Sequence, residues 1–400
     1  MNKRVVVTGM GMITACGIGP EDNWSAMAAG ISGIKEIQSF DASKYRGKCG
    51  GEARGFTPPA VEKLNKGRLD RASLMLIHTV HQAFVQADAV DAAQKEDILV
   101  SLGTTLGGML MGQAFHKEAI QKGLSRARVS LVSDYLAHYQ PVNIIREFGL
   151  RGDTVSFSNA CASGTNAIGY GYRRIRNGEY GMAVCGGYDT MSEFTFAGFN
   201  ALMAVSPTIC RPFDKNRNGL VLGEGAGIVV LEELQHALDR RADILAEVAG
   251  YGESADAYHM TSPDPSGKQA SNAMNNALRD AGYPEIDYIN AHGTGTVLND
   301  AMEAGAISRS FGNRTGTIPV SSIKPMTGHI LGGAGAVEAI VSILAIRHKA
   351  LPPNINYETR DHECDIKIVR ESEGLNVKTV LSNSFGFGGT NASLILREYV

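Results

Sequence analysis

Short hydrophobic runs, some of which end at glycine, alternate with amphipathic segments along the first half of the chain. The runs are rich in β-branched and other apolar residues, as buried strands require, and they lie at residues 4–8, 98–102, 154–158, 181–187 and 225–232. Longer amphipathic or small-residue segments lie between them, at residues 71–89 and 162–177, and another opens with the acids at Glu21. This alternation predicts strands separated by helices, and therefore an α/β fold.

The second half of the chain repeats the same pattern. From residue 242, the hydrophobic pattern predicts a strand at 244–250, a helix at 269–281, a strand at 286–290 and a helix at 332–347. Two similar series of elements indicate a duplicated architecture, with one half at residues 1–241 and the other at residues 242–400.

Composition narrows the class of protein. The 400 residues are 44% hydrophobic and 20% charged, as in soluble globular proteins, and 47 glycines against 13 prolines indicate tight turns. A net charge of −3 argues against nucleic-acid binding, and no segment reaches the roughly 20 apolar residues that span a membrane. Residues 5–15 mimic a signal peptide, but two glycines interrupt them and a buried strand fits better. We therefore expect a cytoplasmic protein.

The cysteines do not indicate a metal site. Six are scattered along the chain without a CxxC pair, a spacing unsuited to zinc and too sparse for a disulfide framework. We expect reduced thiols and no bound metal.

Cys161 lies where a predicted strand turns into a predicted helix. The start of that helix places positive partial charge and free N–H groups near the thiol, which predicts a pKa lowered toward the thiolate. The small residues around it, in the sequence Ser-Asn-Ala-Cys-Ala-Ser-Gly, leave room for a substrate and for an oxyanion hole. A core cysteine is the alternative interpretation, and it suits Cys185 better because that residue lies inside an apolar strand.

Two histidines lie in similar small-residue segments. His292 follows a predicted strand and precedes Gly-Thr-Gly-Thr, and His329 follows Gly328 shortly before a Gly- and Ala-rich helix. Cys161 and His329 thus lie at matching positions of the two half-repeats. Lys324 and Glu338 flank His329 along the chain, either as an ordinary ion pair or as a pair that sets the charge and tautomer of an imidazole. One thiol and two imidazoles suit a thioester enzyme that forms carbon–carbon bonds.

A fourth segment, residues 383–391, places Phe385 and Phe387 among three glycines. It predicts either a mobile loop that contacts a ligand or a plain glycine-rich turn before the last strand. Gly9 and Gly11 after the first strand look like part of a dinucleotide-binding loop, but the third glycine and the distal acid are not placed for it.

With these motifs together, the chain resembles the elongating type II β-ketoacyl-(acyl-carrier-protein) synthases of the thiolase-like superfamily. The resemblance runs from Val5 to Asn391 and includes the segments around Cys161, His292, Lys324 and His329. It implies two pseudo-symmetric βαβαβαββ halves in five α-β-α-β-α layers.

The resemblance also implies a mechanism, decarboxylative Claisen condensation. Cys161 would accept the acyl chain as a thioester, and His292 and His329 would bind the malonyl thioester carbonyl and stabilise the enolate formed as CO2 leaves. The backbone N–H groups of Cys161 and Phe387 would form the oxyanion hole. Two histidines distinguish this pattern from that of a biosynthetic thiolase.

Supporting roles follow from the same resemblance. Lys324 and Glu338 match the charged pair behind the histidines, and Thr294 and Thr296 match residues that contact the phosphopantetheine arm. The remaining matches are a gate and oxyanion loop at Phe385, Phe387 and Gly388, and an acyl tunnel lined by Leu106 and Phe199. The substrates would be carried on the 4′-phosphopantetheine of acyl carrier protein, so the enzyme itself would need no cofactor.

The carrier protein is acidic, so the resemblance implies a basic docking patch, with Lys63, Lys66, Arg68, Arg71, Arg126 and Arg128 as candidates. Met203 stands where elongating synthases commonly have a docking arginine, and residues 130–139 are unusual. Both differences favour a specialised fatty-acid or polyketide-type pathway over housekeeping elongation. We expect a homodimer or a heterodimer with a chain-length-factor-like subunit.

Two other functions are compatible with parts of this pattern. A thioester acyltransferase or thiolase would use Cys161 without decarboxylation, but two histidines argue against it. A non-condensing chain-length factor would lack the nucleophile, whereas Cys161 is present.

Overall fold

The two halves of the chain build their strands in the same order. The computed structural model describes residues 3–400. The first half contributes β1 (Val5–Thr14), β5 (Leu99–Gly103), β6 (Thr154–Phe157), β7 (Met182–Asp189) and β8 (Gly225–Glu233). The second half contributes β9 (Ala246–Ala255), β10 (Tyr288–Asn290), β11 (Pro319–Ser321), β15 (Thr379–Gly386) and β16 (Thr390–Arg397). The strand orders are β6-β5-β7-β8-β1 and β11-β10-β15-β16-β9, which both read 3-2-4-5-1 when strands are numbered within their half.

Strand directions repeat as well. The first three strands in each order are parallel to one another. The fourth strand is antiparallel to the third, and the fifth is antiparallel to the fourth. The halves meet where β1 pairs antiparallel with β9, and β13 (Lys367–Ile368) extends the far edge beside β11. The boundary between residues 241 and 242 stays a prediction, which this repeated order supports.

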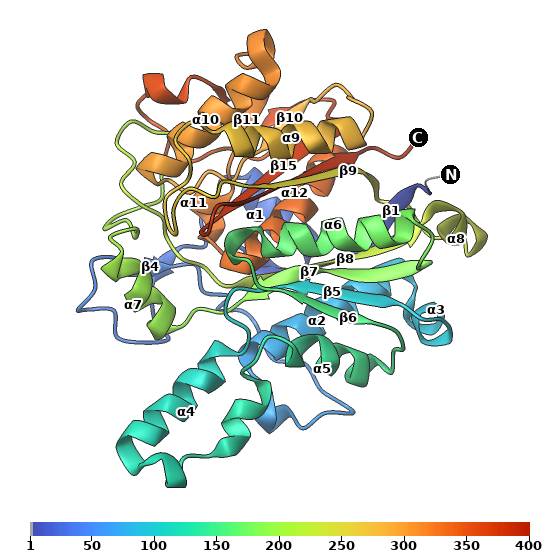
Figure 1. Cartoon of the computed structure of the whole chain (residues 1–400), viewed down its shortest axis with the longest axis vertical. Coiled ribbons are helices and arrows are strands. Elements are labelled where there is room, and N and C mark those ends of the chain that lie inside the picture. Colours follow the sequence, from blue (N-terminus) through green and yellow to red (C-terminus); the bar gives the residue numbers. More distant parts are fainter. Residues whose placement is uncertain (1–2) are drawn as a thin grey trace.

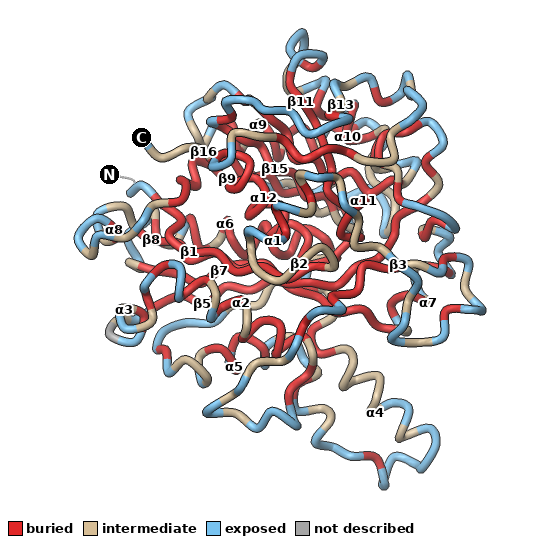
Figure 2. The backbone as a smooth tube through the Cα atoms, turned by 180° about the vertical axis from the view of Figure 1, so that it is seen from behind, coloured by how far each residue is buried: buried red, intermediate tan, exposed pale blue. Residues whose placement is uncertain are grey.

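Helices cover both sheet faces and fill the space between the halves (Figure 1). On the outside of the first half lie α2 (Arg71–Ala87) and α5 (Tyr139–Phe148), and on the outside of the second lie α9 (Lys268–Asp280) and α10 (Val297–Phe311). Between the sheets lie α6 (Ser163–Arg176) and α12 (Ala334–His348), which pack against strands of both halves. This arrangement confirms the predicted βαβαβαββ halves and five layers. Figure 2 shows that buried residues concentrate in this central region.

Shorter elements connect these layers. The helices are α1 (Pro20–Ala28), α3 (Val90–Lys95), α4 (Met109–Lys122), α7 (Glu193–Ala201), α8 (Leu234–Asp239) and α11 (Lys324–Thr327). The strands are β2 (Gly17–Ile18), β3 (Lys35–Glu36), β4 (Cys49–Gly50), β12 (Ala350–Leu351) and β14 (Glu373–Gly374). Short 3₁₀ helices are η1 (Lys66–Arg68), η2 (Leu124–Arg126), η3 (Val129–Asp134), η4 (Ala160–Ala162), η5 (Gly312–Arg314), η6 (Leu331–Gly333) and η7 (His362–Cys364).

The hydrophobic pattern predicted that the first strand ends before Gly9, and this prediction is wrong. The strand continues to Thr14, with a bulge between Val7 and Gly9 in its pairing with β8. A Cβ atom at Gly9 would overlap the carbonyl of Ala83 in α2, and one at Gly11 would overlap that of Thr79. These glycines therefore allow the helix backbone to lie directly on the strand.

One segment of the described chain is long and apolar enough to cross a membrane by composition. Residues 331–348, which include α12, have a mean hydropathy of 1.3, but 89% of them are buried inside the protein. The helix is apolar on every side because both sheets pack against it. It is a core helix.

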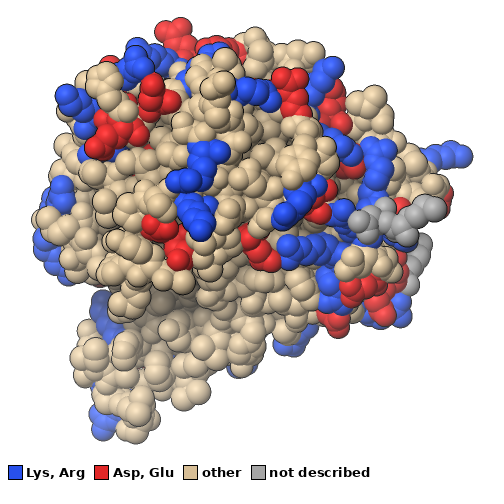
Figure 3. Space-filling view, turned by 45° about the horizontal axis from the view of Figure 1, so that its top comes forward, with Lys and Arg blue, Asp and Glu red and all other residues tan. Residues whose placement is uncertain are grey.

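A lobe that carries α4, η2 and η3 projects from the first half (Figure 1). No residue of α4 is fully buried, and Ile120, Leu124 and Val129 are strongly exposed. In Figure 3 the visible face of this lobe, at the lower left, is mostly uncharged. The sequence pattern did not predict this helix.

Candidate active site

Cys161 lies in the tight turn that links β6 to α6. The preceding residue, Ala160, has a φ of 57°, a left-handed conformation that is unfavourable for a residue with a Cβ atom. The turn places the sulfur in front of the start of α6, and the side chain is 7% exposed. Backbone strain at this point is thus associated with the position of the thiol.

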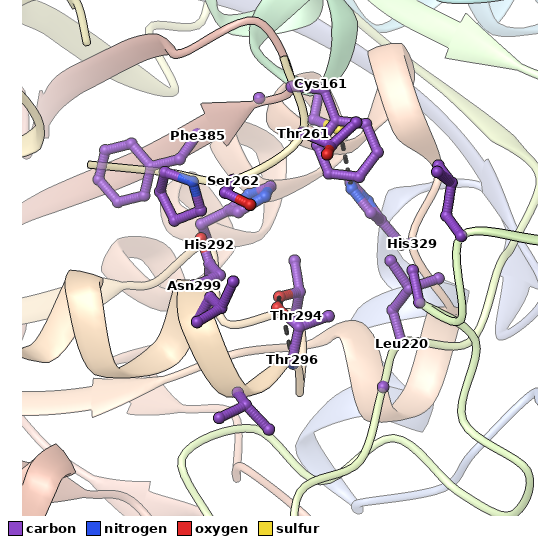
Figure 4. Close-up of a pocket in the computed structure, with 18 of the residues that line it drawn as sticks. Cys161, Leu220, Thr261, Ser262, His292, Thr294, Thr296, Asn299, His329 and Phe385 are labelled. Carbon is purple, nitrogen blue, oxygen red and sulfur yellow. Dashed lines mark hydrogen bonds between the residues drawn. The ribbon is translucent and has the colours of Figure 1, made fainter. Parts of the chain in front are cut away.

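His329 contacts this thiol directly. Its Nε2 lies 3.0 Å from the Sγ of Cys161 (Figure 4). The residue precedes η6 and α12, where Leu331 has a φ of 51° and so corresponds to Ala160 in the other half. By this match the counterpart of Cys161 is Gly332, so the prediction that Cys161 and His329 occupy matching positions is wrong by three residues.

His292 follows β10 and lies beside both groups. Its ring centroid is 5.2 Å from that of His329, with the ring planes at 80°, and 5.9 Å from that of Phe385. The buried carboxylate of Glu303 in α10 accepts hydrogen bonds of 2.8 Å from the backbone N–H groups of His292 and Gly293. This carboxylate holds the loop after β10 in place.

Lys324 and Glu338 meet behind His292. The Lys324 Nζ donates hydrogen bonds to the Glu338 carboxylate and to the His292 carbonyl, and it lies 3.3 Å from Nδ1 of His292. An ammonium can only donate, so Nδ1 accepts and the proton of the neutral ring lies on Nε2. Both alternatives from the sequence apply: the residues form an ion pair, and the pair faces an imidazole.

Burial dominates the electrostatics of these groups. It lowers the pKa values of His292 and His329 well below their usual range, and Lys324 lowers both further. Burial raises the pKa of Cys161 to about 12, although Lys324 and the backbone N–H of Phe387 oppose the shift. The prediction of a thiol pKa lowered by the helix is therefore wrong for the protein without substrate, because desolvation outweighs the helix terminus. A neutral thiol faces two neutral imidazoles.

These groups line the inner part of a cavity of about 330 Å³. Thr294 and Thr296 line it too, and their hydroxyl groups lie 2.8 Å apart. Figure 4 shows the two threonines on the side of the cavity away from Cys161. The cavity is thus lined by reactive groups at its buried end and by small hydroxyl side chains along its wall.

The segment at residues 383–391 is a β-hairpin and not an extended loop. β15 runs to Gly386 and β16 begins at Thr390, which leaves only residues 387–389 in the turn. The Phe387 N–H donates to the sulfur of Cys161, and the Phe387 ring stacks on Phe199 at 5.6 Å. Phe385 and Phe387 line the cavity, and Gly388 lies in the turn beside them.

Leu106 does not line this cavity. It packs with Phe199 against a separate apolar cluster that includes Leu331. Its backbone N–H donates to Asp189, whose carboxylate also accepts the N–H of Gly332. Asp189 therefore connects the chain around Leu106 to the turn at η6, which lies beside the turn that carries Cys161.

The six basic residues predicted for docking lie outside the cavity. Arg71 is half-buried and paired at 2.7 Å with Glu224, and Arg128 is paired at 2.8 Å with Glu118. The Lys66 ammonium donates to the Pro58 carbonyl. The side chains of Lys63, Arg68 and Arg126 are exposed.

Sequence reasoning missed three buried carboxylates that support the site: Glu303, Asp300 and Asp189. Asp300 accepts hydrogen bonds from the backbone N–H groups of Thr294 and Gly295, as Glu303 does from His292. The spacing of Asp300 and Glu303, one helical turn apart shortly after His292, was the available signal.

The sequence spacing argued against a metal, but folding brings one ligand atom each from Cys161, His292 and His329 within 4.8 Å of one another. Such a set is compatible with a metal ion by composition. However, the proton that Lys324 directs to Nε2 of His292 makes that atom a hydrogen-bond donor instead of a ligand. The arrangement therefore favours proton and oxyanion chemistry.

Comparisons with known proteins agree with this geometry. The models for "Beta-ketoacyl synthase, N-terminal domain" and "Beta-ketoacyl synthase, C-terminal domain" match residues 2–237 and 245–358. A 3-oxoacyl-[acyl-carrier-protein] synthase 2 of Coxiella burnetii is 39% identical over 406 aligned positions, covering 98% of each chain.

Two solved structures have the same architecture over the whole of both chains. One, described as the ishigamide ketosynthase/chain length factor, has a TM-score of 0.94 at 35% identity. The other, a ketosynthase bound to its type II polyketide acyl-carrier protein, has a TM-score of 0.88 at 26% identity. With matches over both halves and a full-length relative, the chain belongs to the β-ketoacyl synthase family.

Proposed function

We propose that this protein is a 3-oxoacyl-[acyl-carrier-protein] synthase that joins a Cys161-bound acyl chain to malonyl carrier protein with loss of CO2. The observation that carries the proposal is the convergence of one thiol and two neutral imidazoles, within 4.8 Å of one another, at the buried end of one cavity. Its membership of the β-ketoacyl synthase family supports the same reaction.

In the first step, Cys161 takes the acyl chain from its carrier. The sulfur attacks the thioester carbonyl while its proton passes to Nε2 of His329, 3.0 Å away. The backbone N–H groups of Cys161 and Phe387 stabilise the oxyanion, which suits the N–H of Phe387 already directed at the sulfur. The tetrahedral intermediate collapses, and the carrier thiol leaves with the proton from His329.

In the second step, the malonyl thioester enters and its carbonyl oxygen accepts hydrogen bonds from the two imidazoles. The carbon–carbon bond to the carboxylate breaks, CO2 leaves, and the electron pair forms an enolate that the two N–H groups stabilise. The enolate carbon attacks the acyl thioester carbonyl, the bond to sulfur breaks, and Cys161 leaves as a thiolate that takes a proton from solvent. Neutral imidazoles are needed as donors in this second step, and the lowered pKa values of His292 and His329 support this role.

Other residues act as supports for these steps. Lys324 and Glu338 keep the proton of His292 on the nitrogen that faces the substrate. Thr294 and Thr296 contact the pantetheine arm, and the Phe385, Phe387 and Gly388 segment opens the acyl tunnel beyond Phe199 and Leu106. The stacking of Phe387 on Phe199 supports a closed gate in this structure.

The proposed partners are an acyl carrier protein and a second thiolase-like subunit. β6 is an edge strand of the sheet with unpaired backbone groups, and the nearby α4 lobe exposes apolar side chains. Both features suit an interface with a second copy of this chain or with a chain-length-factor-like subunit. Lys63, Lys66, Arg68 and Arg126 attract the acidic carrier from the surface, whereas Arg71 and Arg128 already have carboxylate partners. We place the protein in the cytoplasm, in a fatty-acid or polyketide-type pathway, and assign it no cofactor of its own.

Acylation of the intact protein tests the proposal. An acyl carrier thioester should add the mass of one acyl group to the wild type and to Cys49→Ala, the control at a half-buried thiol that does not line the cavity, but not to Cys161→Ala. Malonyl carrier protein should then release CO2 and the 3-oxoacyl product. Acylation of Cys161→Ala at the wild-type rate would exclude the mechanism, and acylation without condensation would favour an acyltransferase.

A further inference from the structure

The carboxylate of Asp189 lies at the end of β7, where it is completely buried and does not line the cavity. One of its oxygens accepts hydrogen bonds from the Thr104 hydroxyl at 2.7 Å and from the Leu106 N–H at 2.9 Å. The other oxygen accepts the Thr105 N–H at 2.9 Å and the Gly332 N–H at 2.7 Å. A single buried side chain therefore links the segment after β5 to the turn at η6.

This link is a charged one. Desolvation raises the pKa of Asp189 to about 6, and the four hydrogen bonds that it accepts oppose the shift. The carboxylate is therefore largely ionised at neutral pH. Hydrogen bonds to an ionised acceptor are about twice as strong as those between neutral groups, so the two segments are held firmly to Asp189.

The two linked segments also contact each other through their backbones. A Cβ atom at Gly332 would come within 2.6 Å of the backbone at residues 104–105. A Cβ atom at Gly164, three residues after Cys161, would come within 2.7 Å of the Gly332 carbonyl oxygen. No flexible side chain lies between these segments to absorb a movement, so a shift in one is transmitted to the others.

The two ends of the link lie at different parts of the proposed reaction. Leu106 packs with Phe199 in the apolar cluster that the proposed acyl tunnel crosses. Gly332 lies in η6, three residues after His329, whose ring contacts the sulfur of Cys161. Leu106 does not line the cavity that contains Cys161. An acetyl group on the sulfur therefore stays inside the cavity, and only a longer chain reaches Leu106.

We propose that Asp189 is a positioning residue that holds the wall of the acyl tunnel at Leu106 in a fixed place relative to Cys161 and His329. The inference rests on the proposed function, because the tunnel is part of that function. A long chain that binds against Leu106 then has its thioester carbonyl at the reacting groups, and its remote binding energy favours the transition state. Without the link, the wall moves independently of the nucleophile, and long chains lose this advantage while an acetyl group does not.

The test compares acyl chains of different length in Asp189→Asn. An asparagine side chain offers one acceptor oxygen, and its amide group faces N–H donors on the other side, so it breaks the link whichever way it points. Time-resolved mass spectrometry of the intact protein gives the second-order rate constants of Cys161 acylation by acetyl, hexanoyl and decanoyl thioesters of a type II acyl carrier protein. We expect the ratio of the decanoyl to the acetyl rate constant to fall about tenfold below that of the wild type.

Asp214 provides a matched control. It is also completely buried, accepts hydrogen bonds from three backbone N–H groups and does not line the cavity. Asp214→Asn should therefore leave the ratio unchanged. A general loss of stability caused by a buried asparagine would affect both variants alike.

Thr104 offers a second test that does not depend on the folding of Asp189→Asn. Thr104→Val removes the hydroxyl that donates to Asp189 and accepts the Gly107 N–H, whereas Thr104→Ser keeps it. The valine variant should lower the ratio about threefold, because it weakens the link without removing the carboxylate. The serine variant should keep the wild-type ratio.

Three results would overturn the inference. They are equal slowing, or no slowing, of all three acyl lengths in Asp189→Asn, an unchanged ratio in Thr104→Val, or a wild type that accepts only the acetyl group, which would show that no chain reaches Leu106. Failure of the proposed function is distinguishable, because wild-type Cys161 would then accept no acyl group from any of the thioesters.

Discussion

Lys324 and Glu338 form an ion pair in which each side chain is only 1% exposed. Burial raises the pKa of Glu338 to about 7, and the neighbouring ammonium opposes that shift. Each charge is therefore tolerated because of the other, and Lys324 in turn determines which nitrogen of His292 carries the proton.

Single substitutions in this pair should be strongly destabilising. Lys324→Met and Glu338→Leu each leave one buried group unpaired, and each should lower the free energy of unfolding by about 3–5 kcal/mol. The double variant should lose less than the sum of the two, because no unpaired charge remains. Denaturant unfolding measures this cycle, and Arg360→Gln, in an exposed ion pair with Asp365, serves as the control with little effect on the free energy of unfolding. Additive losses in the double variant would contradict the coupling.

The raised pKa of Cys161 predicts how its reactivity depends on pH. A thiol with a pKa of about 12 is protonated at neutral pH, and its thiolate fraction grows about tenfold for each pH unit below that value. Alkylation of Cys161 by iodoacetamide, followed by peptide mass spectrometry, should therefore accelerate from pH 6 to pH 9 without a plateau. A plateau near pH 7 would instead indicate a thiolate–imidazolium pair with His329.

The sequence predicted which residues lie together at the site, but not the pKa values of their side chains. Segments around Cys161, His292 and His329 stood out because small residues surround each reactive side chain, and the repeated strand-helix pattern implied the layers that bring them together. The direction of the Cys161 pKa shift was wrong because it depends on burial, which is a sum over the packed neighbours and has no signature along the chain.

Glu303 and the α4 lobe were missed for a different reason. Glu303 acts on backbone N–H groups of His292 and Gly293, so the sequence signal for its role is its spacing from Asp300 and no motif that includes its partners. Helix α4 has no fully buried residue, so its sequence shows neither a clear helical stripe nor a strand alternation. Boundaries of the other elements shifted by a few residues, most clearly where β15 continues through Phe385.

His236 should make stability depend on pH outside the active site. Its ring lies 2.7 Å from the buried Glu232 and 2.9 Å from Glu96, while Arg240 also pairs with Glu232. Hydrogen bonding to Glu232 raises the pKa of His236 despite partial burial. The stabilisation from protonated His236 is complete below the unfolded-state pKa of about 6.5 and is lost as pH rises through the higher folded-state value.

The measurement for His236 compares unfolding of the wild type and His236→Gln across pH. The wild type should be more stable by about 1 kcal/mol at pH 5.5, and this advantage should shrink by pH 9. An advantage that grows with pH would show that the neutral ring, and not the charged one, is the stabilising form.

Two helical glycines should respond in opposite directions to the same substitution. Gly335 lies in α12 where it crosses α6, and a Cβ there would overlap the hydroxyl of Thr165 and come within 2.7 Å of Ser384 Oγ. Gly305 lies in α10 with nothing within 4 Å of the added Cβ. Helix propensity alone favours alanine by about 1 kcal/mol at both positions.

We expect Gly305→Ala to raise the free energy of unfolding by about 0.5–1 kcal/mol, and Gly335→Ala to lower it by about 1–3 kcal/mol because the overlap forces the central helices apart. Thermal and denaturant unfolding of the two variants measure the difference. Because α6 begins just after Cys161, Gly335→Ala should also slow acylation of Cys161, whereas Gly305→Ala should not. Equal stabilisation by both substitutions would contradict this prediction, because it would show that the central helices are loosely packed.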